Sequence, residues 1–305
     1  MRLLLTGASG FLGKELYLRL KEQGHEVLGL SRHGPDLIGD VTERNLGLEA
    51  DPHVDAIFHL AGIVDLGQRN KSHIWKVNVD GTHNVLSFCV DCNIPHLLFC
   101  STAYTQGRNM YELSKQECEK RVDLFRKIHN LKVTVFKPSV IVANTRNFNS
   151  DGAQGLYNFA IVAAKVHHRL EEIRRKVEGA LRFPPMRPVL RFKGDPRGRL
   201  NIIPVDTVAN FMATHLDEGT FWVTNPDPPT LKEITSWVGR AILLDLRILK
   251  EFRPTPIEVL FSHLVAPFLP YLKGEESFHS DVEACPEVRE EFIVKTVTQF
   301  VLGGG

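Results

Sequence analysis

The chain has no long hydrophobic run. No stretch of about 18 apolar residues occurs in the sequence, which therefore predicts no membrane-spanning helix. The nearest candidate, 257–272, is broken by His263, Pro267 and Pro270, and we interpret it as a buried or lid-like segment. The first residues also lack the apolar core and the small-residue cleavage site of a signal peptide, so we expect a cytoplasmic location.

Neither sign of charge is in clear excess, and cysteine is also scarce. The formal net charge is +1 at pH 7, which gives no electrostatic reason to expect a nucleic-acid partner. The 5 cysteines are an odd, scattered set, which is typical of a reducing compartment. Cys89 and Cys92 have C-x-x-C spacing, but no second pair follows at zinc spacing. We therefore expect two ordinary helical cysteines and no metal site.

What the chain does have is an alternation of short apolar runs and helical patterns. This alternation predicts an α/β fold of the Rossmann type, in which helices cover a doubly wound parallel sheet. The predicted strands are 3–5, 27–30, 56–60, 96–100 and 133–136, and the predicted helices are 73–92, 112–129 and one that starts at Phe11.

The alternation loosens after about residue 138. The pattern predicts a long helix over 152–176, a proline cluster at Pro184, Pro185 and Pro188, and later strands at 200–203 and 221–224. We predict a Rossmann domain over 1–145, a fold that commonly binds a dinucleotide cofactor, and a smaller substrate-binding lobe over 146–305. Some elements of the lobe, around 200–225, are expected to return to the main sheet.

A glycine-rich turn lies directly between the first strand and the first helix. Its spacing, G-x-x-G-x-x-G, lets the backbone approach a pyrophosphate at the N-terminus of a helix. An incidental tight turn is the alternative, but the strand–turn–helix context favours dinucleotide binding. The predicted cofactor-binding residues of this turn are Thr6, Gly7, Ser9, Gly10, Phe11, Leu12 and Gly13.

The end of the second strand bears on the choice of dinucleotide. An acidic residue there binds the ribose 2′-hydroxyl of NAD. This strand ends instead in Ser31 and Arg32, and a guanidinium matches the oxygens of a 2′-phosphate. The sequence thus favours NADP(H) over NAD, and the alternative reading of Arg32 is a solvated surface side chain.

Tyr111 and Lys115 are four residues apart, so they share one face of a helix. An ammonium beside a phenol favours the phenolate, and we expect Lys115 to lower the pKa of Tyr111. Such a phenol can exchange a proton with a substrate oxygen. Ser101 and Thr102 end a predicted strand just upstream and can donate to a substrate carbonyl. The order of these motifs favours a catalytic site over a surface helix.

These residues resemble the extended short-chain dehydrogenase/reductase family over 1–145. Gly39-Asp40-Val41 resembles the motif whose Asp meets the adenine, and Leu60-Ala61-Gly62 resembles a strand end beside the cofactor. The resemblance implies that residues outside the glycine-rich turn also bind NAD(P). These further cofactor-binding residues are Asp40, Val41, Leu60, Ala61, Gly62, Asn78, Ser101, Pro138, Ser139 and Val140.

Within that family, the segment 101–107 is similar to the S-T-A-Y-x-x-G of fatty acyl and carrier-protein thioester reductases. Aligned on that pattern, Thr102 rather than Ser101 takes the catalytic hydroxyl position, beside Tyr111 and Lys115. The resemblance implies NADPH-dependent reduction of an acyl thioester or related carbonyl. The chain departs from the pattern at Lys137, where an arginine is usual, and in the short interval between Thr102 and Tyr111.

Partners and alternatives remain open at this point. The positive segment 165–199 suits coenzyme A, an acyl carrier protein or a nucleotide-sugar pyrophosphate, although a solvated helix face explains it equally well. The competing functions are a reductase, a nucleotide-sugar epimerase or dehydratase with tightly bound NAD, and a non-catalytic dinucleotide-binding protein. The resemblance also implies a homodimer through the helices 73–92 and 112–129.

Overall fold

The computed structural model describes residues 1–67, 70–181, 189–274 and 277–303. The predicted proline cluster at Pro184, Pro185 and Pro188 lies outside the described residues. The chain divides into two compact units. The first combines Met1–Ile141 with Ile203–Pro226 and Phe278–Cys285, and the second holds Val142–Ile202, Asp227–Ser277 and Pro286–Gly305. In the described part of the chain, no helix is both long enough and apolar enough to cross a membrane.

A seven-stranded sheet forms the centre of the first unit, and its neighbouring strands are parallel. Its order is β10-β6-β5-β4-β1-β2-β3, so the chain reverses direction across the sheet between β1 and β4. This arrangement confirms the predicted Rossmann fold. The strands are β1 (Arg2–Thr6), β2 (Glu26–Ser31), β3 (Leu37–Ile38), β4 (Ala56–His59), β5 (His96–Cys100), β6 (Lys132–Pro138) and β10 (Gly219–Val223).

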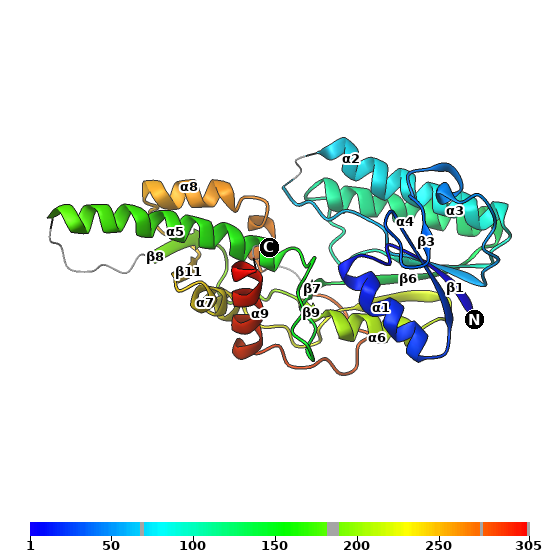
Figure 1. Cartoon of the computed structure of the whole chain (residues 1–305). Coiled ribbons are helices and arrows are strands. Elements are labelled where there is room, and N and C mark those ends of the chain that lie inside the picture. The colour runs from blue at the N-terminus through cyan, green and yellow to red at the C-terminus, as the bar shows by residue number, and fades with distance from the viewer. Residues whose placement is uncertain (68–69, 182–188, 275–276, 304–305) are drawn as a thin grey trace. The chain divides into compact units, whose positions relative to one another are not determined.

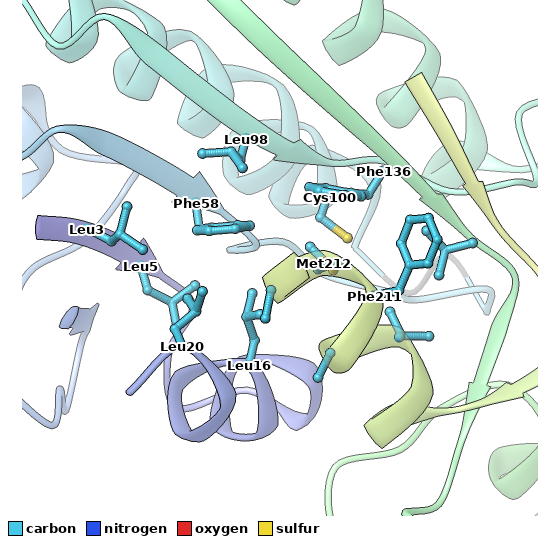
Figure 2. Packing of buried hydrophobic residues seen from close by; sticks show 14 of the residues in the cluster. Leu3, Leu5, Leu16, Leu20, Phe58, Leu98, Cys100, Phe136, Phe211 and Met212 are labelled. Atoms are coloured by element: carbon cyan, nitrogen blue, oxygen red, sulfur yellow. The ribbon is translucent and has the colours of Figure 1, made fainter. Parts of the chain in front are cut away.

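Helices cover both faces of this sheet (Figure 1). On one face, α1 (Phe11–Glu22) packs beside α6 (Val205–Thr214). Figure 2 shows their apolar side chains meeting those of the strands, with Leu16 and Met212 facing Leu5 and Phe58. On the other face, α3 (Gly81–Asp91) and α4 (Met110–His129) bury a second cluster. Burial on both faces explains why the central strands are continuous apolar runs rather than alternating ones.

The predicted helix 73–92 is divided into three parts. It consists of α2 (Lys71–Trp75), the π-helix η2 (Lys76–Asp80) and α3. A π-helical turn holds one more residue than an α-helical turn, and such turns are frequent at functional sites. Here the wide turn contains Asn78, which is buried. A short 3₁₀ helix, η1 (Arg44–Gly47), follows β3.

The second unit contains a parallel pair of strands, β8 (Val189–Lys193) and β11 (Asp245–Leu249), and several helices. The helix predicted over 152–176 begins later, at Leu156, because Gly152 and Gly155 have positive φ angles of 86° and 61°. The helices of this unit are α5 (Leu156–Leu181), α7 (Leu231–Ala241), α8 (Pro256–Leu264), the 3₁₀ helix η3 (Leu269–Leu272) and α9 (Glu290–Leu302).

The segment 257–272 folds as most of α8 followed by η3. Phe261 is buried against Phe159 and Phe192, so part of this segment packs in the core of the second unit. A separate two-stranded sheet pairs β7 (Val140–Val142) with β9 (Ile202–Pro204). The assignment of a cofactor role to 1–145 and a substrate role to 146–305 stays a prediction, since compactness alone does not reveal a role.

Candidate active site

The glycine-rich turn follows β1 at the point where the strand order reverses. Gly7 has φ +74°, and a Cβ on it would lie 2.7 Å from the backbone nitrogen of Ala61. A Cβ on Gly13 would lie 2.0 Å from the Gly7 carbonyl oxygen. Only glycine therefore fits at these two positions, where the turn packs against the end of β4 and the start of α1.

The N-terminus of α1 fits a pyrophosphate. Gly10 is the N-cap, and no side chain caps the first N–H groups of this helix. Gly10 and Ser9 are exposed, whereas Phe11 and Leu12 are partly buried and Leu12 packs against the core. Uncapped N–H groups and the positive end of the helix dipole suit the phosphates of a dinucleotide.

Ser31 and Arg32 lie at the end of β2, as the sequence predicts, and Arg32 is exposed. An acid does lie nearby, on the loop that follows. Asp36 accepts hydrogen bonds from the Gly29 backbone N–H at 2.8 Å and from the Tyr17 hydroxyl at 3.2 Å. One bond reaches each carboxylate oxygen, so Asp36 fastens its loop to β2 and α1.

Asp40 and Val41 follow β3. The Asp40 carboxylate accepts the Thr42 backbone N–H at 2.8 Å, which forms a local turn. The side chain of Val41 is buried, and a Cβ on Gly81 would lie 2.9 Å from it. The Val41 side chain therefore packs in the core. Only the Val41 backbone lies along the loop where the family resemblance implies that the adenine binds.

Leu60, Ala61 and Gly62 continue from β4 beside the glycine-rich turn. The Thr6 hydroxyl accepts the Ala61 backbone N–H at 3.3 Å, which ties the ends of β1 and β4 together. Gly62 is exposed, and a Cβ on it would lie 3.5 Å from Nζ of Lys115. The predicted cofactor segment and the predicted catalytic helix therefore meet at Gly62.

Tyr111 and Thr102 lie close together, and the Thr102 hydroxyl acts to lower the pKa of the Tyr111 phenol. Tyr111 is in the first turn of α4 and is half-buried, whereas Thr102 follows β5 and is buried. The Thr102 hydroxyl also lies 3.5 Å from the Pro138 carbonyl oxygen and accepts the Tyr104 backbone N–H at 3.2 Å. Two hydroxyl groups thus lie together at the carboxyl end of the sheet.

Lys115 lies one turn after Tyr111, and its ammonium donates to the Cys100 carbonyl oxygen at 2.9 Å. The same group lies 5.2 Å from the centre of the Phe99 ring, in a cation–π arrangement. Lys115 is buried, so these contacts hold its ammonium at the end of β5.

The expected lowering of the Tyr111 pKa is wrong for the structure as it stands. Burial raises the pKa of Tyr111 above its usual range, and the charge that Cys100 would carry adds to the rise. The Thr102 hydroxyl opposes the rise without cancelling it. Tyr111 is therefore a protonated phenol at neutral pH, which is the form that a general acid needs.

Ser101 faces a different group from its neighbour Thr102. Its hydroxyl donates to the Glu119 carboxylate, which also accepts the Lys137 ammonium at 2.8 Å. Lys137, where the family usually has arginine, lies 5.1 Å from the centre of the Trp222 ring. The Ser101 hydroxyl is thus committed to an ion pair rather than to Tyr111.

Asn78 joins the π-helix to the catalytic helix. Its amide nitrogen donates to the Ser114 hydroxyl at 2.9 Å and to the Ile63 carbonyl at 3.1 Å, and its amide oxygen accepts the Ile63 N–H at 2.7 Å. Ser114 in turn donates to the Tyr111 carbonyl at 2.7 Å. Asn78 therefore positions the loop beyond β4 and the first turn of α4.

Pro138 ends β6, Ser139 follows it, and Val140 begins β7. Ser139 is buried, and its hydroxyl has no hydrogen-bond partner among the described residues. A buried hydroxyl without a partner is costly, and a bound group that accepts or donates a hydrogen bond would offset that cost. This hydroxyl, together with the open N-terminus of α1, fits a bound dinucleotide.

Sequence reasoning missed His59, a buried histidine on β4. Its Nδ1 lies 2.8 Å from the Thr6 hydroxyl and its Nε2 lies 3.0 Å from the Thr82 hydroxyl. Burial, and next the charge of Lys115, lowers the pKa of His59 to about 3. His59 directly precedes the Leu60-Ala61-Gly62 strand end that the sequence singled out, but its partners come from distant segments.

Cys89 is buried and Cys92 is partly buried. Burial raises the pKa of Cys89 to about 12 and also raises the pKa of Cys92. The thiolate, the form that binds metal or attacks a disulfide, is therefore disfavoured at both positions. Both cysteines are free, and the described residues contain no group of three or more His, Cys, Asp or Glu side chains arranged to hold a metal.

Comparison with known families gives a decisive match. Residues 3–175 match the NAD dependent epimerase/dehydratase family. The chain belongs to this family. The match places it among NAD(P)-dependent enzymes of the extended short-chain dehydrogenase/reductase type, as the motifs indicated.

Curated relatives of this epimerase/dehydratase-family chain match over shorter segments. A 2-alkyl-3-oxoalkanoate reductase of Stenotrophomonas maltophilia is 37% identical over 112 residues, which is 33% of this chain and 33% of that protein. A GDP-6-deoxy-D-talose 4-dehydrogenase of Aggregatibacter actinomycetemcomitans is 30% identical over 168 residues, covering 49% and 56%. An uncharacterized protein of Mycobacterium tuberculosis is 34% identical over 112 residues, and the match spans only 12% of that protein.

Solved structures share the fold of this chain over nearly its whole length. The terminal R domain from the myxalamid PKS-NRPS biosynthetic pathway gives a TM-score of 0.73 at 18% identity, covering 99% of this chain and 91% of that one. A Thermus thermophilus UDP-glucose 4-epimerase in complex with NAD gives 0.61 at 19% identity and covers 100% of both chains. At these identities the likeness concerns the fold alone.

Proposed function

We propose that this chain is an NADPH-dependent oxidoreductase that reduces an acyl thioester or a related carbonyl, with Tyr111 as the general acid. The observation that carries the proposal is the closeness of Thr102 to Tyr111, beside a buried Lys115 whose ammonium is held at the end of β5. A phenol and a hydroxyl that converge at the carboxyl end of the sheet suit a substrate oxygen on which charge develops.

Each residue has a distinct part in this proposal. The Thr102 hydroxyl donates a hydrogen bond to the substrate carbonyl oxygen, and Tyr111 gives that oxygen its proton. Lys115 supports the phenolate that Tyr111 leaves behind, because an ammonium stabilises a nearby negative charge. When bound, the reduced nicotinamide supplies the hydride.

For a thioester, the proposed reaction balances with one NADPH and one proton. Hydride adds to the carbonyl carbon while the proton passes from Tyr111 to the oxygen. The carbon–sulfur bond then breaks, the hydroxyl proton is lost, and the sulfur leaves as a thiol. The products are an aldehyde, a thiol and NADP⁺.

The preference for NADPH rests on the end of β2. Arg32 is exposed there, while the carboxylate of Asp36 is already engaged with Gly29 and Tyr17. A guanidinium with this freedom suits a 2′-phosphate, and an engaged carboxylate is poorly placed for a 2′-hydroxyl. Both cofactors occur among structures that share the fold, in complexes with NADPH and with NAD.

The substrate class rests on the S-T-A-Y segment and on charge. Among the described cations of 165–199, several are already paired, such as Arg191 with Glu258 at 2.6 Å and Arg199 with Asp227 at 2.6 Å. Arg182 and Arg187 lie outside the described residues. The remaining positive charge supports a substrate carried on coenzyme A or an acyl carrier protein, with less strength than the sequence alone suggests.

Exposed apolar side chains support a homodimer. Leu124 and Ile128 lie on the outer face of α4 and are 53% and 64% exposed. Apolar side chains on one helix face suit burial against a second copy of the chain.

A nucleotide-sugar epimerase or dehydratase is the second candidate. The family that matches residues 3–175 favours it, because the family's description includes these reactions. Such an enzyme would bind NAD tightly and return the hydride, so it would show no net consumption of cofactor.

One assay separates the two candidates. The purified protein is incubated with NADPH or NADH and with acyl thioesters, aldehydes, ketones and nucleotide sugars, and both cofactor oxidation and product mass are followed. We expect net oxidation of NADPH, with release of thiol from a thioester. Isomerised or dehydrated sugar without net oxidation would overturn the reductase and support the alternative.

Replacement of the phenol tests the role of Tyr111. We predict that Tyr111→Phe lowers kcat by about 10³-fold, because general acid–base catalysis contributes on that order. Dinucleotide affinity, measured by fluorescence titration, should stay within about twofold, since the predicted contacts of the phosphates lie on the glycine-rich turn. Turnover close to the parent rate in Tyr111→Phe would remove Tyr111 from the mechanism.

A further inference from the structure

A short loop, 105–109, connects the segment after β5 to α4 and delivers Tyr111. It folds back onto the helix that follows it. Gly107 has φ +78°, and the Gln116 side chain donates to the Thr105 carbonyl. The Asn109 side chain caps the helix by accepting the Glu112 N–H at 3.0 Å. The loop is therefore held by side chains from the first two turns of α4.

Glu112 makes the largest share of these contacts, and its side chain is fully buried. One carboxylate oxygen accepts the backbone N–H groups of Gln106 and Arg108, at 3.1 and 3.0 Å. The other accepts Nε of Arg108 at 2.9 Å, and Nη2 of the same guanidinium lies 2.7 Å away. A buried carboxylate is tolerated only when its oxygens are satisfied in this way.

Two other helices of the protein show what a glutamate at this position ordinarily does. Glu233 in α7 and Glu258 in α8 each accept the backbone N–H of their own N-cap residue and complete a capping box. Glu112 instead reaches further back, to the loop residues Gln106 and Arg108. Its side chain therefore organises the loop rather than merely closing the helix.

We propose that Glu112 is a positioning residue, which holds the Tyr111 phenol against Thr102 by clamping the loop 105–109 and Arg108 onto α4. The proposal rests on the proposed role of Tyr111 as general acid. Glu112 is adjacent to Tyr111 in sequence, so any shift of the first turn of α4 moves the phenol as well. A displacement of about 1 Å at a reacting group can cost about a hundredfold in rate.

The charge of Glu112 also acts on Tyr111. After burial and the influence of Cys100, the negative charge of Glu112 contributes to the raised pKa of Tyr111, as does Cys118 on the same helix. The Thr102 hydroxyl acts in the opposite direction. Removing the charge of Glu112 therefore lowers the pKa of Tyr111, whereas removing the Arg108 guanidinium takes a positive charge away from Glu112 and raises it.

Two variants that are expected to shift the Tyr111 pKa in opposite directions test the proposal. Glu112→Gln keeps the size of the side chain, and Arg108→Gln keeps the carboxylate. Tyrosine labelled at Cζ reports the titration of Tyr111 by NMR, with Tyr111→Phe to assign the signal. We expect kcat to fall about tenfold or more in both variants, with KM for the dinucleotide within about twofold. The Tyr111 midpoint should move to lower pH in Glu112→Gln and to higher pH in Arg108→Gln.

Glu258→Gln is the matched control, because Glu258 is also a buried glutamate in the first turn of a helix and is paired with Arg191. It should lower the urea midpoint of unfolding while kcat and the Tyr111 midpoint stay unchanged. The proposal is overturned if Glu112→Gln behaves like this control. If Glu112→Gln does not fold, an unmoved Tyr111 midpoint in Arg108→Gln overturns it. Because NMR titration needs no substrate, failure of the proposed function would leave this test intact.

Discussion

At the scale of single residues, the structure separates two adjacent hydroxyls that look equivalent in the sequence. Thr102 lies beside Tyr111, whereas Ser101 donates to Glu119. Neighbouring residues at the end of a strand point to opposite sides, which explains the division. The family pattern favoured Thr102 for the catalytic position, and the contact with Tyr111 supports that hypothesis.

We predict that Thr102→Val lowers kcat by about a hundredfold, because loss of one donor to a developing oxyanion costs on this order. Valine keeps the shape of threonine, so the fold should persist. Ser101→Ala should reduce kcat far less, and should lower the free energy of unfolding by about 1 kcal/mol through loss of its bond to Glu119. Steady-state kinetics and urea unfolding of both variants check this, and equal losses of kcat would contradict the division.

Local spacing alone predicts where some of these residues lie. The four-residue spacing of Tyr111 and Lys115 predicts that they share a helix face, and the glycine spacing predicts the turn. Both features could therefore be predicted from the sequence. The roles of Glu112 and His59 could not be, because each depends on its partners. His59 bonds to Thr6 and Thr82, which the sheet and helix packing bring together from distant parts of the chain.

At the scale of elements, the glycine-rich turn contains glycines with two different purposes. Gly13 packs against the carbonyl of Gly7, whereas Gly10 faces open space apart from one contact at 3.1 Å. The turn therefore combines a structural glycine with one that leaves room for a ligand.

We predict that Gly13→Ala lowers the free energy of unfolding by at least about 2 kcal/mol, since its Cβ would overlap the backbone. Gly10→Ala should cost less than about 1 kcal/mol, because the neighbouring carbonyl needs to move by only a few tenths of an ångström. It should nevertheless weaken dinucleotide binding by about tenfold, since the methyl group enters the space near the helix N-terminus. Urea unfolding and fluorescence titration measure both effects, and the reverse ranking would contradict the assignment.

The sequence predicted the elements of the main sheet better than those of the second unit. Long apolar runs such as 96–100 are unambiguous, and β5 occupies that range. By contrast, β8 and β11 alternate buried and exposed residues over only five positions, and the sequence analysis assigned no strand there. The π-helix was also unpredicted, because one extra residue in a turn hardly changes the apolar periodicity of a long helix.

At the scale of the whole molecule, buried histidines make stability sensitive to acid. Burial lowers the pKa of His59 to about 3, and burial also lowers the pKa of His96 to about 4. In the unfolded chain both titrate near 6.5, so the unfolded state binds more protons at lower pH. Above pH 6.5 both imidazoles bind few protons in either state, so their contribution to the pH dependence of the free energy of unfolding vanishes.

We predict that the free energy of unfolding falls between pH 6.5 and about 4.5, with His59 contributing about 1.4 kcal/mol per pH unit. Carboxylates with lowered pKa values, such as Glu258 at about 2, act below this window. Urea unfolding across this range measures the slope, and His59→Gln should reduce it while lowering stability at pH 7. An unchanged slope in His59→Gln would show that this imidazole is not the source.

The first unit is assembled from three separate stretches of chain, and this has a consequence for biosynthesis. The apolar side chains of β1 and β4 are covered by residues of α6, by Val223 and by Val282. A ribosome that has finished the first 145 residues has thus produced most of the sheet and α1, but not α6, which covers the rest of that face. The nascent protein must keep this apolar surface of the sheet shielded from water, by transient collapse or by a chaperone, until translation passes residue 285.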